Sequence, residues 1–481
     1  DHPCAADLDL FGQGSLFQLL SLARTRVGAA TLARWLLTPA TPDVVRLRQC
    51  AVEELRANTA LREDLALYAQ ALAEDVDAAS LSRWSQEPDI FPKPHFRHIA
   101  RVLVILGAVA AILSYGADSI WPCIYVLTAD VIVLGVAAGR LKRLGTALEE
   151  PRRELNVLGK VIARFQREPF QCPLLKALRE RFYHEQMAAS AALQRLDRLS
   201  YFFEMQANQL FAPFSIALLW GIHIAYRIEA WRKTWGAQLP QWLEAVGELE
   251  ALASLACFAY ERAEYVFPEL REGVALFEAD GLKHPLLPGA TCVENSLHLD
   301  AAQPLLLVSG SNMSGKSTLL RTAGINTILA MAGAPVAARR LALGPLRAGA
   351  TIAVHDSIQG GVSRFYAEIK RLKQLMDFAQ DQDTRLLFLL DEILHGTNSH
   401  DRRIGAEAIL TKLLERGAIG LVTTHDLAIT GMGGAMVDKA VNAHFEDTVG
   451  EVGPVFDYRL KPGVVQRSNA LALMRSVGLD V

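Results

Sequence analysis

The sequence predicts a multidomain protein in which an all-α region precedes an α/β domain. Three observations predict this fold class. Residues 15–75 carry apolar side chains at helical spacing, and residues 141–275 return to long amphipathic helices. From about residue 276, short apolar runs typical of buried parallel strands alternate with helices. The length of 481 residues exceeds what one core supports and allows about three domains.

The composition restricts the functional class. The formal net charge is −3, so the chain lacks the overall basicity of many nucleic-acid-binding proteins, and any basic surface must be local. Six cysteines are scattered without a CxxC pair or metal-ligand spacing, which is typical of thiols in a reducing compartment. Hydrophobic residues make up 51%, a high share for a wholly soluble chain.

Two apolar runs, 102–114 and 120–138, predict a helical hairpin over residues 99–140. Basic residues flank the pair, and the linker between the runs carries only Asp118, as expected of a transmembrane hairpin with both ends in the cytosol. The first run is short for a span, and Asp130 in the second is costly in lipid, so a buried soluble hairpin is the alternative. The flanking basic residues are Arg97, Arg101, Arg140, Lys142 and Arg143.

A third apolar stretch, 210–226, is interpreted as a core helix, with a further membrane span as the alternative. These patterns divide the chain into four parts. They are the first part of a helical core (1–98), the hairpin (99–140), a helical lever with the second part of the core (141–275), and the α/β domain (276–481).

The stretch LLLVSGSNMSGKSTLL (305–320) joins an apolar strand to a helix through a glycine-bracketed loop. It satisfies GxxxxGK[ST], in which the glycines let backbone N–H groups face phosphates and the helix N-terminus favours anions. Lys316 would reach the β- and γ-phosphate oxygens, and Ser317 would ligate Mg²⁺. The loop therefore predicts an α/β P-loop NTPase domain. The predicted nucleotide-binding residues are Gly310, Ser311, Asn312, Met313, Ser314, Gly315, Lys316, Ser317 and Thr318.

Two further strand ends extend the predicted site. LLFLLDE (386–392) places Asp391 at the end of a buried strand, where it would hold Mg²⁺ through water. Glu392 follows directly and would polarise the attacking water. LVTTHD (421–426) ends another strand with His425, which is placed to sense the γ-phosphate. Hydrolysis of a nucleoside triphosphate is therefore predicted.

ABC-type and MutS-type ATPases both combine these strands with a catalytic glutamate and a switch histidine, and the LSGGQ segment of ABC proteins does not occur between the two motifs here. The sequence resembles the MutS family. GSNMSGKST resembles its GPNMGGKST loop, VSRFYAE its STFMVE segment, DEILHGTNSHD its DEIGRGTSTYD motif and TTHD its ATH motif. The resemblance extends upstream to SLFQLLSLARTRVG and KHPLL, and downstream to YRLKPGVVQRSNALALMRSVGL.

The resemblance implies ATP and Mg²⁺ as cofactors and gives roles to particular residues. Asn312 would contact the γ-phosphate alongside Lys316. Glu392 would be the catalytic carboxylate and His425 the switch. Ser363 would reach in trans across a homodimer to the partner's nucleotide, giving two composite sites per dimer; a plain helix N-cap is the alternative for this serine.

The departures from the family pattern are also informative. The family has an aromatic residue that stacks on adenine, and Cys292 stands near that position here. The family's mismatch-reading domain precedes the core, whereas this chain enters the core almost at once and its levers look short. The resemblance therefore implies a variant lacking the mismatch-reading and clamp domains. Phe202 and Glu204 match the family's Phe-x-Glu motif by letter only, because they lie in a late helical region.

Together these features predict a membrane-tethered, dimeric MutS-like ATPase that couples ATP binding and hydrolysis to conformational change on DNA, with its ATPase domain in the cytosol. One alternative is a soluble cytoplasmic mismatch-repair or recombination protein whose hairpin is core. Another is a mechanical ATPase that acts on a membrane or protein partner without DNA. Basic residues could meet DNA phosphates, although a solvated helix face is the simpler interpretation. They are Arg152, Arg153, Lys160, Arg164 and Arg167.

Overall fold

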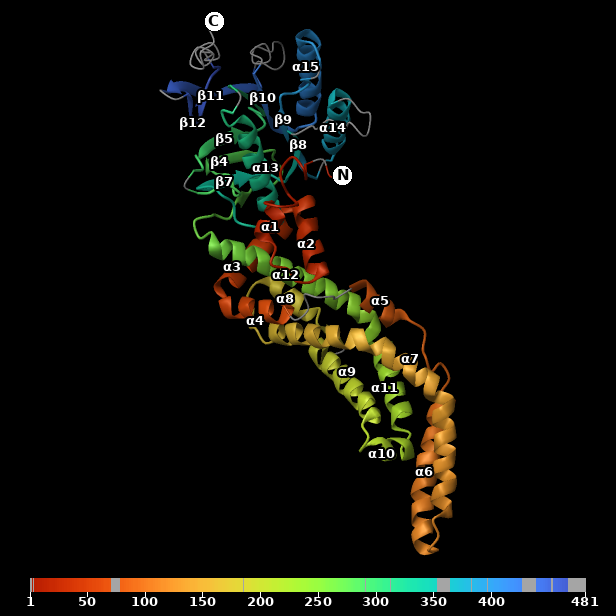
Figure 1. Cartoon of the computed structure of the whole chain (residues 1–481). Helices are drawn as coiled ribbons and strands as arrows, with labels where there is room; N and C mark the ends of the chain where they lie inside the picture. The colour runs from red at the N-terminus through yellow and green to blue at the C-terminus, as the bar shows by residue number, and fades with distance from the viewer. Residues whose placement is uncertain are drawn as a thin grey trace. The chain divides into compact units, whose positions relative to one another are not determined.

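The chain folds as two compact units in a computed structural model. Unit 1 comprises Asp1–Ser21, Thr31–Ala57 and Leu252–Val481, and unit 2 comprises Leu22–Ala30 and Asn58–Ala251 (Figure 1). The structure describes residues 2, 4–70, 78–184, 186–289, 291–311, 313–352, 364–381, 383–395, 397–425, 438–450 and 453–465.

In the residues of unit 2 that the structure describes, helices make up the regular structure apart from one short pair of strands. The long helices α7 and α9 pack along each other, and α11 packs on α9. Trp231 of α11 is buried in this packing, and its indole N–H donates to the Ala192 carbonyl of α9 at 2.7 Å. The elements are α4 Thr59–Gln70, α5 Ala78–Gln86, α6 His95–Gly116, α7 Trp121–Gln166, α8 Pro173–Glu180, β1 Tyr183–His184, β2 Met187–Ala188, α9 Ala189–Glu204, η1 Met205–Ala207, α10 Ala212–Ala217, α11 Trp220–Trp235, η2 Gly236–Gln238 and α12 Leu239–Glu261, which continues into unit 1.

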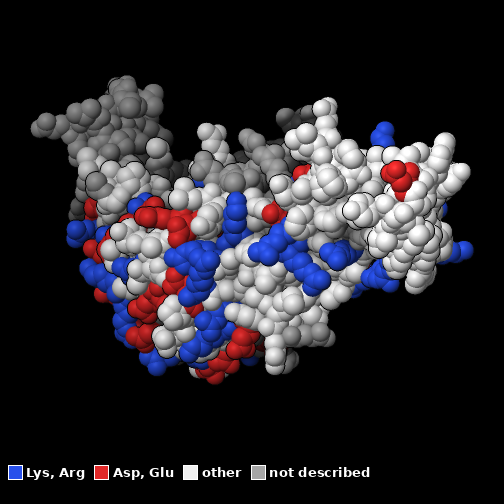
Figure 2. Space-filling view, turned by 90° about the horizontal axis from the view of Figure 1, so that it is seen from below, with Lys and Arg blue, Asp and Glu red and all other residues white. Residues whose placement is uncertain are grey.

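Helix α6 and the first part of α7 form the hairpin predicted at 99–140. Both are long and apolar enough to cross a membrane by length and composition, and only 11% of each apolar window is buried. Ile112 is 71% exposed, whereas Asp130 is 2% exposed and so faces the inside of the helix pair. Figure 2 shows this region, at the right of the view, as a surface almost free of charge beside the mixed charges of the rest. Within unit 2 the hairpin is therefore not a buried core.

Helix α7 extends beyond the hairpin to Gln166, whereas the sequence analysis placed a boundary near residue 140. Pro151 lies inside the helix, where its ring removes one backbone hydrogen bond. Contacts with α4 and α9 hold the second half of α7 in place, so tertiary packing outweighs the local helix-breaking tendency of the proline.

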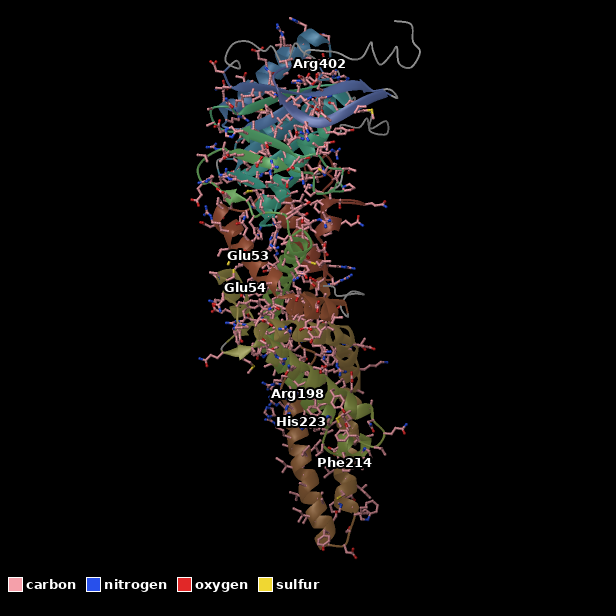
Figure 3. The ribbon with its side chains drawn as sticks, turned by 90° about the vertical axis from the view of Figure 1, so that its left-hand side faces the viewer. Glu53, Glu54, Arg198, Phe214, His223 and Arg402 are labelled. Atoms are coloured by element: carbon pink, nitrogen blue, oxygen red, sulfur yellow. The ribbon has the colours of Figure 1, made fainter. Side chains whose placement is uncertain are left out.

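The apolar stretch 210–226 divides into two parts. In α11, Ile222 and its neighbours are buried, so the core interpretation is correct there. Leu210 and Phe214 are 88% and 64% exposed, so that interpretation is wrong for the segment before α11. Figure 3 labels Phe214 on α10 and His223 on α11. These helices adjoin the hairpin, because α10 contacts α7 and α11 contacts α6.

Unit 1 combines N-terminal helices with two sheets. Helix α3 begins at Pro42, since proline is well suited to the first turn of a helix. The elements are α1 Leu16–Leu20, α2 Arg26–Leu37, whose first residues belong to unit 2, α3 Pro42–Ala57, β3 Glu269–Leu270, β4 Phe277–Leu282, β5 Asn295–Leu299, β6 Leu305–Ser309, α13 Lys316–Ala332, β7 Arg340–Leu343, β8 Leu346–Thr351, α14 Arg364–Phe378, β9 Arg385–Asp391, α15 Ser399–Glu415, β10 Ile419–Thr424, β11 Ala440–Gly450 and β12 Gly453–Pro462.

The six-stranded sheet has the order β12-β11-β6-β10-β9-β8, in which only β12 runs antiparallel to its neighbour. The smaller sheet has the order β3-β7-β4-β5. In the larger sheet Ser309 pairs with Thr424, and Asp391 pairs with Thr423. The carboxyl ends of β6, β9 and β10 therefore lie at one edge, which is where α/β sheets bind ligands.

Helices cover both faces of the parallel sheet, which is why its strands are unbroken apolar runs. On one face, Leu305, Phe388 and Leu390 belong to a core cluster with residues of α14 and α15. On the other face α13 packs against β8 and β9. Gly324 of α13 permits this approach, because a Cβ there would lie 2.7 Å from Cδ1 of Leu389. The rigid sheet fixes the strand ends that carry the predicted site.

Candidate functional site

The loop between β6 and α13 uses two glycines for steric reasons. Gly315 has a φ of 102°, in the left-handed region that favours glycine, and forms the N-cap of α13. A Cβ on Gly315 would lie 3.2 Å from Cδ1 of Tyr458. A Cβ on Gly310 would lie 2.9 Å from Oγ of Ser314 and 3.0 Å from the Phe445 carbonyl oxygen. Neighbouring atoms therefore approach the backbone at both positions so closely that a side chain would be crowded.

The loop surrounds Lys316 with its own oxygens. The ammonium of Lys316 donates to the carbonyls of Gly310 at 2.8 Å and Ser311 at 2.7 Å. Burial lowers the pKa of Lys316, and the nearby Glu392 and Asp391 carboxylates act in the opposite direction. The hydroxyls of Ser311 and Ser314 are buried and, within the described residues, have no hydrogen-bond partner. Orphaned donors in a loop of this kind suit an anion.

Three side chains from separate elements meet at the ends of β9 and β10. The Ser317 hydroxyl, in the first turn of α13, donates to Oδ2 of Asp391 at 2.5 Å. The Thr423 hydroxyl donates to the other carboxylate oxygen of Asp391. This pairing fixes the orientation of the carboxylate. It places an alcohol oxygen and a carboxylate oxygen together, the type of oxygen ligands that Mg²⁺ prefers.

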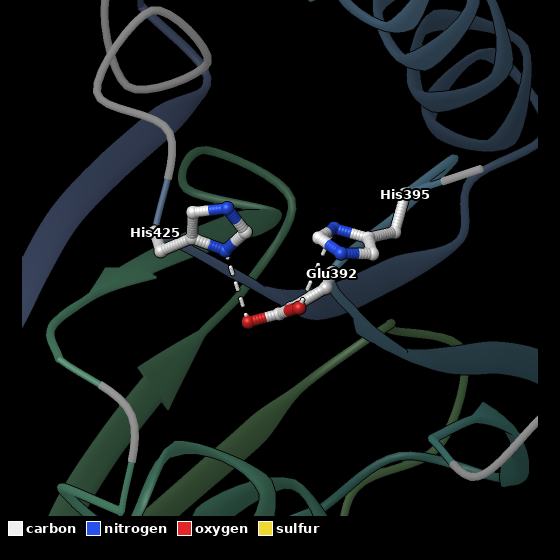
Figure 4. Close-up of side chains that lie close together, drawn as sticks. All are labelled: Glu392, His395 and His425. Carbon is white, nitrogen blue, oxygen red and sulfur yellow. Dashed lines mark hydrogen bonds and ion pairs between the residues drawn. The ribbon is translucent and has the colours of Figure 1, made fainter. Parts of the chain in front are cut away.

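Glu392 leaves the end of β9 with a φ of 52°, and its backbone N–H donates to the Thr423 carbonyl at 3.1 Å. Its carboxylate lies between two histidines (Figure 4). Nδ1 of His425 is 3.0 Å from Oε1, and Nδ1 of His395 is 3.6 Å from Oε2. The two imidazole rings meet edge to face with their centroids 5.3 Å apart.

The segment after Glu392 is anchored from α14. Glu368, which is buried, accepts a hydrogen bond from the backbone N–H of Leu394 at 2.5 Å. Leu394 has a φ of 56°, so the turn is held in a conformation that leucine rarely adopts. Arg402 of α15 also donates to the Leu394 carbonyl at 3.3 Å. These contacts position the backbone that carries His395.

A cavity of about 560 Å³ opens beside the loop. One end is polar and contains Lys316, Ser317, Asp391 and Glu392. The rest of the lining includes apolar side chains and the aromatic ring of Tyr458. The remaining residues of this part of the lining include Leu282, His284, Leu287, Cys292, Val293 and Phe445.

Tyr458 reaches the cavity because β12 bulges. Phe445 of β11 pairs with Leu460 and Asp447 pairs with Phe456, so β12 carries extra residues around Tyr458. Tyr458 itself has a φ of 53°. Asn295 fixes the bulge from β5, because its amide donates to the Tyr458 carbonyl at 3.0 Å and its carbonyl accepts from the Leu460 N–H at 2.7 Å.

His284 also lines the cavity, as a neutral imidazole. Burial lowers its pKa from 6.5 to about 4. Its Nδ1 accepts a hydrogen bond from the Leu286 N–H at 3.3 Å, and the backbone N–H of His284 donates to Sγ of Cys292 at 3.3 Å. Cys292 therefore lines the cavity near the position that the sequence analysis assigned to it.

The structure brings most of the predicted site residues together around this cavity. Met313, Gly315, Lys316, Ser317, Thr318, Asp391 and Glu392 line it directly, whereas His425 reaches it through Glu392. Asn312 and Ser363 lie outside the described residues. Sequence reasoning missed Tyr458 as a wall and did not single out His395. In the sequence, Tyr458 is visible only as the first residue of the C-terminal segment that resembles the family, and His395 only as a histidine three residues after Glu392.

Two of the five basic residues considered for DNA contact, Arg152 and Arg164, form ion pairs within unit 2. Arg152 pairs with Asp197 and Glu204, and Arg164 pairs with Asp64 and Glu168. The side chain of Arg153 lies outside the described residues. These ion pairs agree with the interpretation that Arg152 and Arg164 lie on a solvated helix face. Phe202 of the Phe-x-Glu letters packs edge to face on Trp220 instead of projecting freely.

Comparison with known proteins identifies the domain. A family model, MutS domain V, matches residues 306–480. The DNA mismatch repair protein MutS of Methanosarcina acetivorans is 26% identical over 97% of this chain and 56% of its own length. The endonuclease MutS2 of Thermus thermophilus is 35% identical over 50% of this chain and 31% of its own length. Residues 306–480 therefore carry MutS domain V, and nearly the whole chain is similar to a MutS protein.

Within the MutS family, the DNA mismatch repair protein MutS of Natronomonas pharaonis is 33% identical over 49% of this chain and 27% of its own length. The chain therefore spans between about a quarter and just over half of the length of these relatives. The MutS domain V match contains the loop, the Asp391–Glu392 pair and His425, so the cavity belongs largely to that domain.

Proposed function

We propose that this chain binds Mg-ATP in the cavity beside Lys316 and hydrolyses it. The observation that carries the proposal is the convergence of Lys316, the Ser317–Asp391 pair and Glu392 at one end of a cavity of about 560 Å³. Anionic phosphate oxygens would replace the neutral carbonyls that Lys316 now contacts, so the attraction between opposite charges would be added to these hydrogen bonds. The unpartnered hydroxyls of Ser311 and Ser314 would supply further donors.

The adenine base would occupy the part of the cavity that the apolar side chains line, where Tyr458 offers a flat face. This aromatic residue comes from β12 and would supply stacking that Cys292 does not. Ser317 and Asp391 are the residues that would hold Mg²⁺, which neutralises phosphate charge when bound. The residues in the loop fit that ion, because the donor set consists of oxygens.

Glu392 is the proposed general base. Its carboxylate lies at the polar end of the cavity and has His425 at 3.0 Å, so the imidazole can orient it toward an attacking water. The proposal assigns the contact with the γ-phosphate to Asn312 and the trans contact in a homodimer to Ser363. The proposed dimer would close on ATP binding and reopen after hydrolysis.

The partner proposed by family relationship is DNA, since the relatives carry the names DNA mismatch repair protein and endonuclease. A decisive experiment measures the steady-state ATPase rate with homoduplex, mismatched and branched DNA, and without DNA. Stimulation by one DNA form supports the proposal. A rate indifferent to all DNA forms favours a mechanical ATPase with a membrane or protein partner. If the native chain does not hydrolyse ATP under any of these conditions and Lys316→Ala does not change ATP binding, the cavity is not the proposed ATPase site.

The hairpin supports a second proposal, that the chain is tethered to the cytoplasmic membrane with its ATPase domain in the cytosol. Its apolar side chains are exposed rather than buried in unit 2. Leu210 and Phe214 are also exposed, and α10, which carries Phe214, contacts α7. Such side chains suit the boundary between a membrane and water. If the hairpin is instead covered by protein, the soluble alternative holds.

Membrane fractionation tests the tether. The chain should sediment with membranes and resist alkaline extraction, and the double variant Ile112→Arg, Ile132→Arg should move to the soluble fraction or be degraded. Both positions are more than half exposed. Leu67→Arg is the matched control, because Leu67 is 65% exposed but lies on α4 outside the hairpin. A native chain that stays soluble without detergent contradicts the proposal.

A further inference from the structure

Glu392, His395 and His425 form a cluster that the proposed hydrolysis does not fully use. One ligand atom from each of the three side chains lies within 4.8 Å of those of the other two. They come from the end of β9, the turn that follows it and the end of β10. Figure 4 shows both imidazoles turned toward the carboxylate.

We propose that these three side chains bind a transition-metal dication of the zinc class, and that the bound metal inhibits ATP hydrolysis by occupying the Glu392 carboxylate. Two neutral imidazoles and one carboxylate are the ligands of three-residue zinc sites. Mg²⁺ prefers oxygen ligands and belongs with Ser317 and Asp391 instead. The two ions would therefore use different side chains.

The spacing of the cluster suits such an ion after small side-chain rotations. Nδ1 of His425 is already 3.0 Å from one carboxylate oxygen, and Nδ1 of His395 is 3.6 Å from the other. Ligands about 2.0–2.2 Å from a tetrahedral zinc lie roughly 3.3–3.6 Å from one another. All three ligand atoms lie within 4.8 Å of one another, so even a pair at that limit needs to close by only about 1.2–1.5 Å, which the partly exposed histidines can accommodate.

The backbone of the turn after β9 holds His395 close to Glu392. Glu392 and Leu394 both have positive φ values, and Glu368 and Arg402 fix the Leu394 peptide through hydrogen bonds. The turn therefore brings His395 back over Glu392 although only two residues separate them. Both histidines are more than two-fifths exposed, so a metal ion can enter from solvent and keep a water as its fourth ligand.

Inhibition follows from the acid–base chemistry, and this consequence rests on the proposed function. A carboxylate coordinated to a dication is a weaker proton acceptor, because the positive charge stabilises its ionised form. Glu392 would then no longer accept the proton of the attacking water. Metal binding itself does not depend on hydrolysis, so it is measured separately.

The binding experiment titrates the purified chain with Zn²⁺ by calorimetry and with Co²⁺ by visible absorption, in the absence of nucleotide. We expect one site per chain, with the bands of a four-coordinate cobalt ion and without the near-ultraviolet band of a thiolate ligand. His395→Gln removes one ligand and should weaken binding by at least about tenfold, since loss of even a supporting residue costs about 10- to 100-fold. His400→Gln removes a histidine outside the cluster and should bind as the native chain does.

The activity experiment measures Mg-ATPase rates at buffered free Zn²⁺ concentrations. His395→Gln should keep the native rate without zinc within about twofold and shift the inhibition curve by at least about tenfold. Equal zinc binding by His395→Gln and the native chain overturns the site. Full activity with zinc bound overturns the inhibition. A chain that binds Co²⁺ through His395 but never hydrolyses ATP rejects the proposed function and leaves the metal site standing.

Discussion

Replacing Glu392 by glutamine separates chemistry from binding in the proposed ATPase. The amide keeps the size of the side chain and can still bond His425, but it cannot accept a proton from water. General-base catalysis contributes about 10²- to 10⁴-fold, which corresponds to about 2.7–5.4 kcal/mol of barrier. We therefore expect the single-turnover rate of ATP hydrolysis to fall by a factor in that range.

ATP binding should behave differently. Glu392 and Asp391 are negative charges beside a pocket that must accept a polyanion, and both counter the burial that lowers the pKa of Lys316. Removing one of these charges reduces repulsion of the phosphates, so the affinity of Glu392→Gln for ATP should equal or exceed that of the native chain.

The assay combines quenched single turnovers with equilibrium binding of a fluorescent ATP analogue. Glu415→Gln, at an exposed site on α15, is the matched control and should change neither quantity. A Glu392→Gln rate within tenfold of the native rate would refute the role of this carboxylate as the base. Loss of both hydrolysis and binding would indicate a structural defect and would equally fail to support the reasoning.

Three further predictions test other parts of the site. Tyr458→Ala should weaken ATP binding by about 5- to 150-fold, from about 1–3 kcal/mol of lost stacking, whereas Tyr458→Phe should bind normally; equal affinities in a fluorescence titration would exclude stacking. Ser317→Ala should raise the Mg²⁺ concentration for half-maximal ATPase by about tenfold or more, because a bond to a charged partner is worth about 1.5–3 kcal/mol, and an unchanged Mg²⁺ titration would contradict this. The folded-state pKa of His284, about 4, lies below its ordinary 6.5, so unfolding takes up a proton and stability should fall by up to about 3 kcal/mol as pH drops from 6.5 to 4. Urea unfolding at several pH values should show this loss in the native chain and less of it in His284→Gln, and identical pH profiles would disprove the assignment.

The phosphate end of the cavity was predictable because its signals are local. A strand, a glycine-bracketed loop and a helix follow one another within 305–320, and the spacing alone sets which backbone groups face inward. The apolar runs ending at Asp391 and His425 could be placed at the same edge, because parallel strands share that edge.

The part of the cavity proposed to hold the adenine base was not predictable, because its position depends on contacts between segments far apart in the sequence. Tyr458 enters through a bulge in β12 that depends on pairing with β11 and on Asn295 of β5, and nothing in the local sequence encodes that register. Likewise, the histidine after Glu392 approaches the carboxylate only because two left-handed residues reverse the chain there. Helix α7 continues through Pro151 because contacts with α4 and α9 outweigh the local effect of the proline, and these contacts cannot be read from the local sequence.

The continuity of α7 has a mechanical consequence. At 1.5 Å per residue its 46 residues form a rod about 70 Å long, with one end in the apolar hairpin and the other packed among helices of unit 2. A continuous helix has no flexible joint, so a tilt or rotation of the hairpin is carried along α7 to the helices against which it packs. Pro151 removes a single backbone hydrogen bond, and the rod bends most easily there.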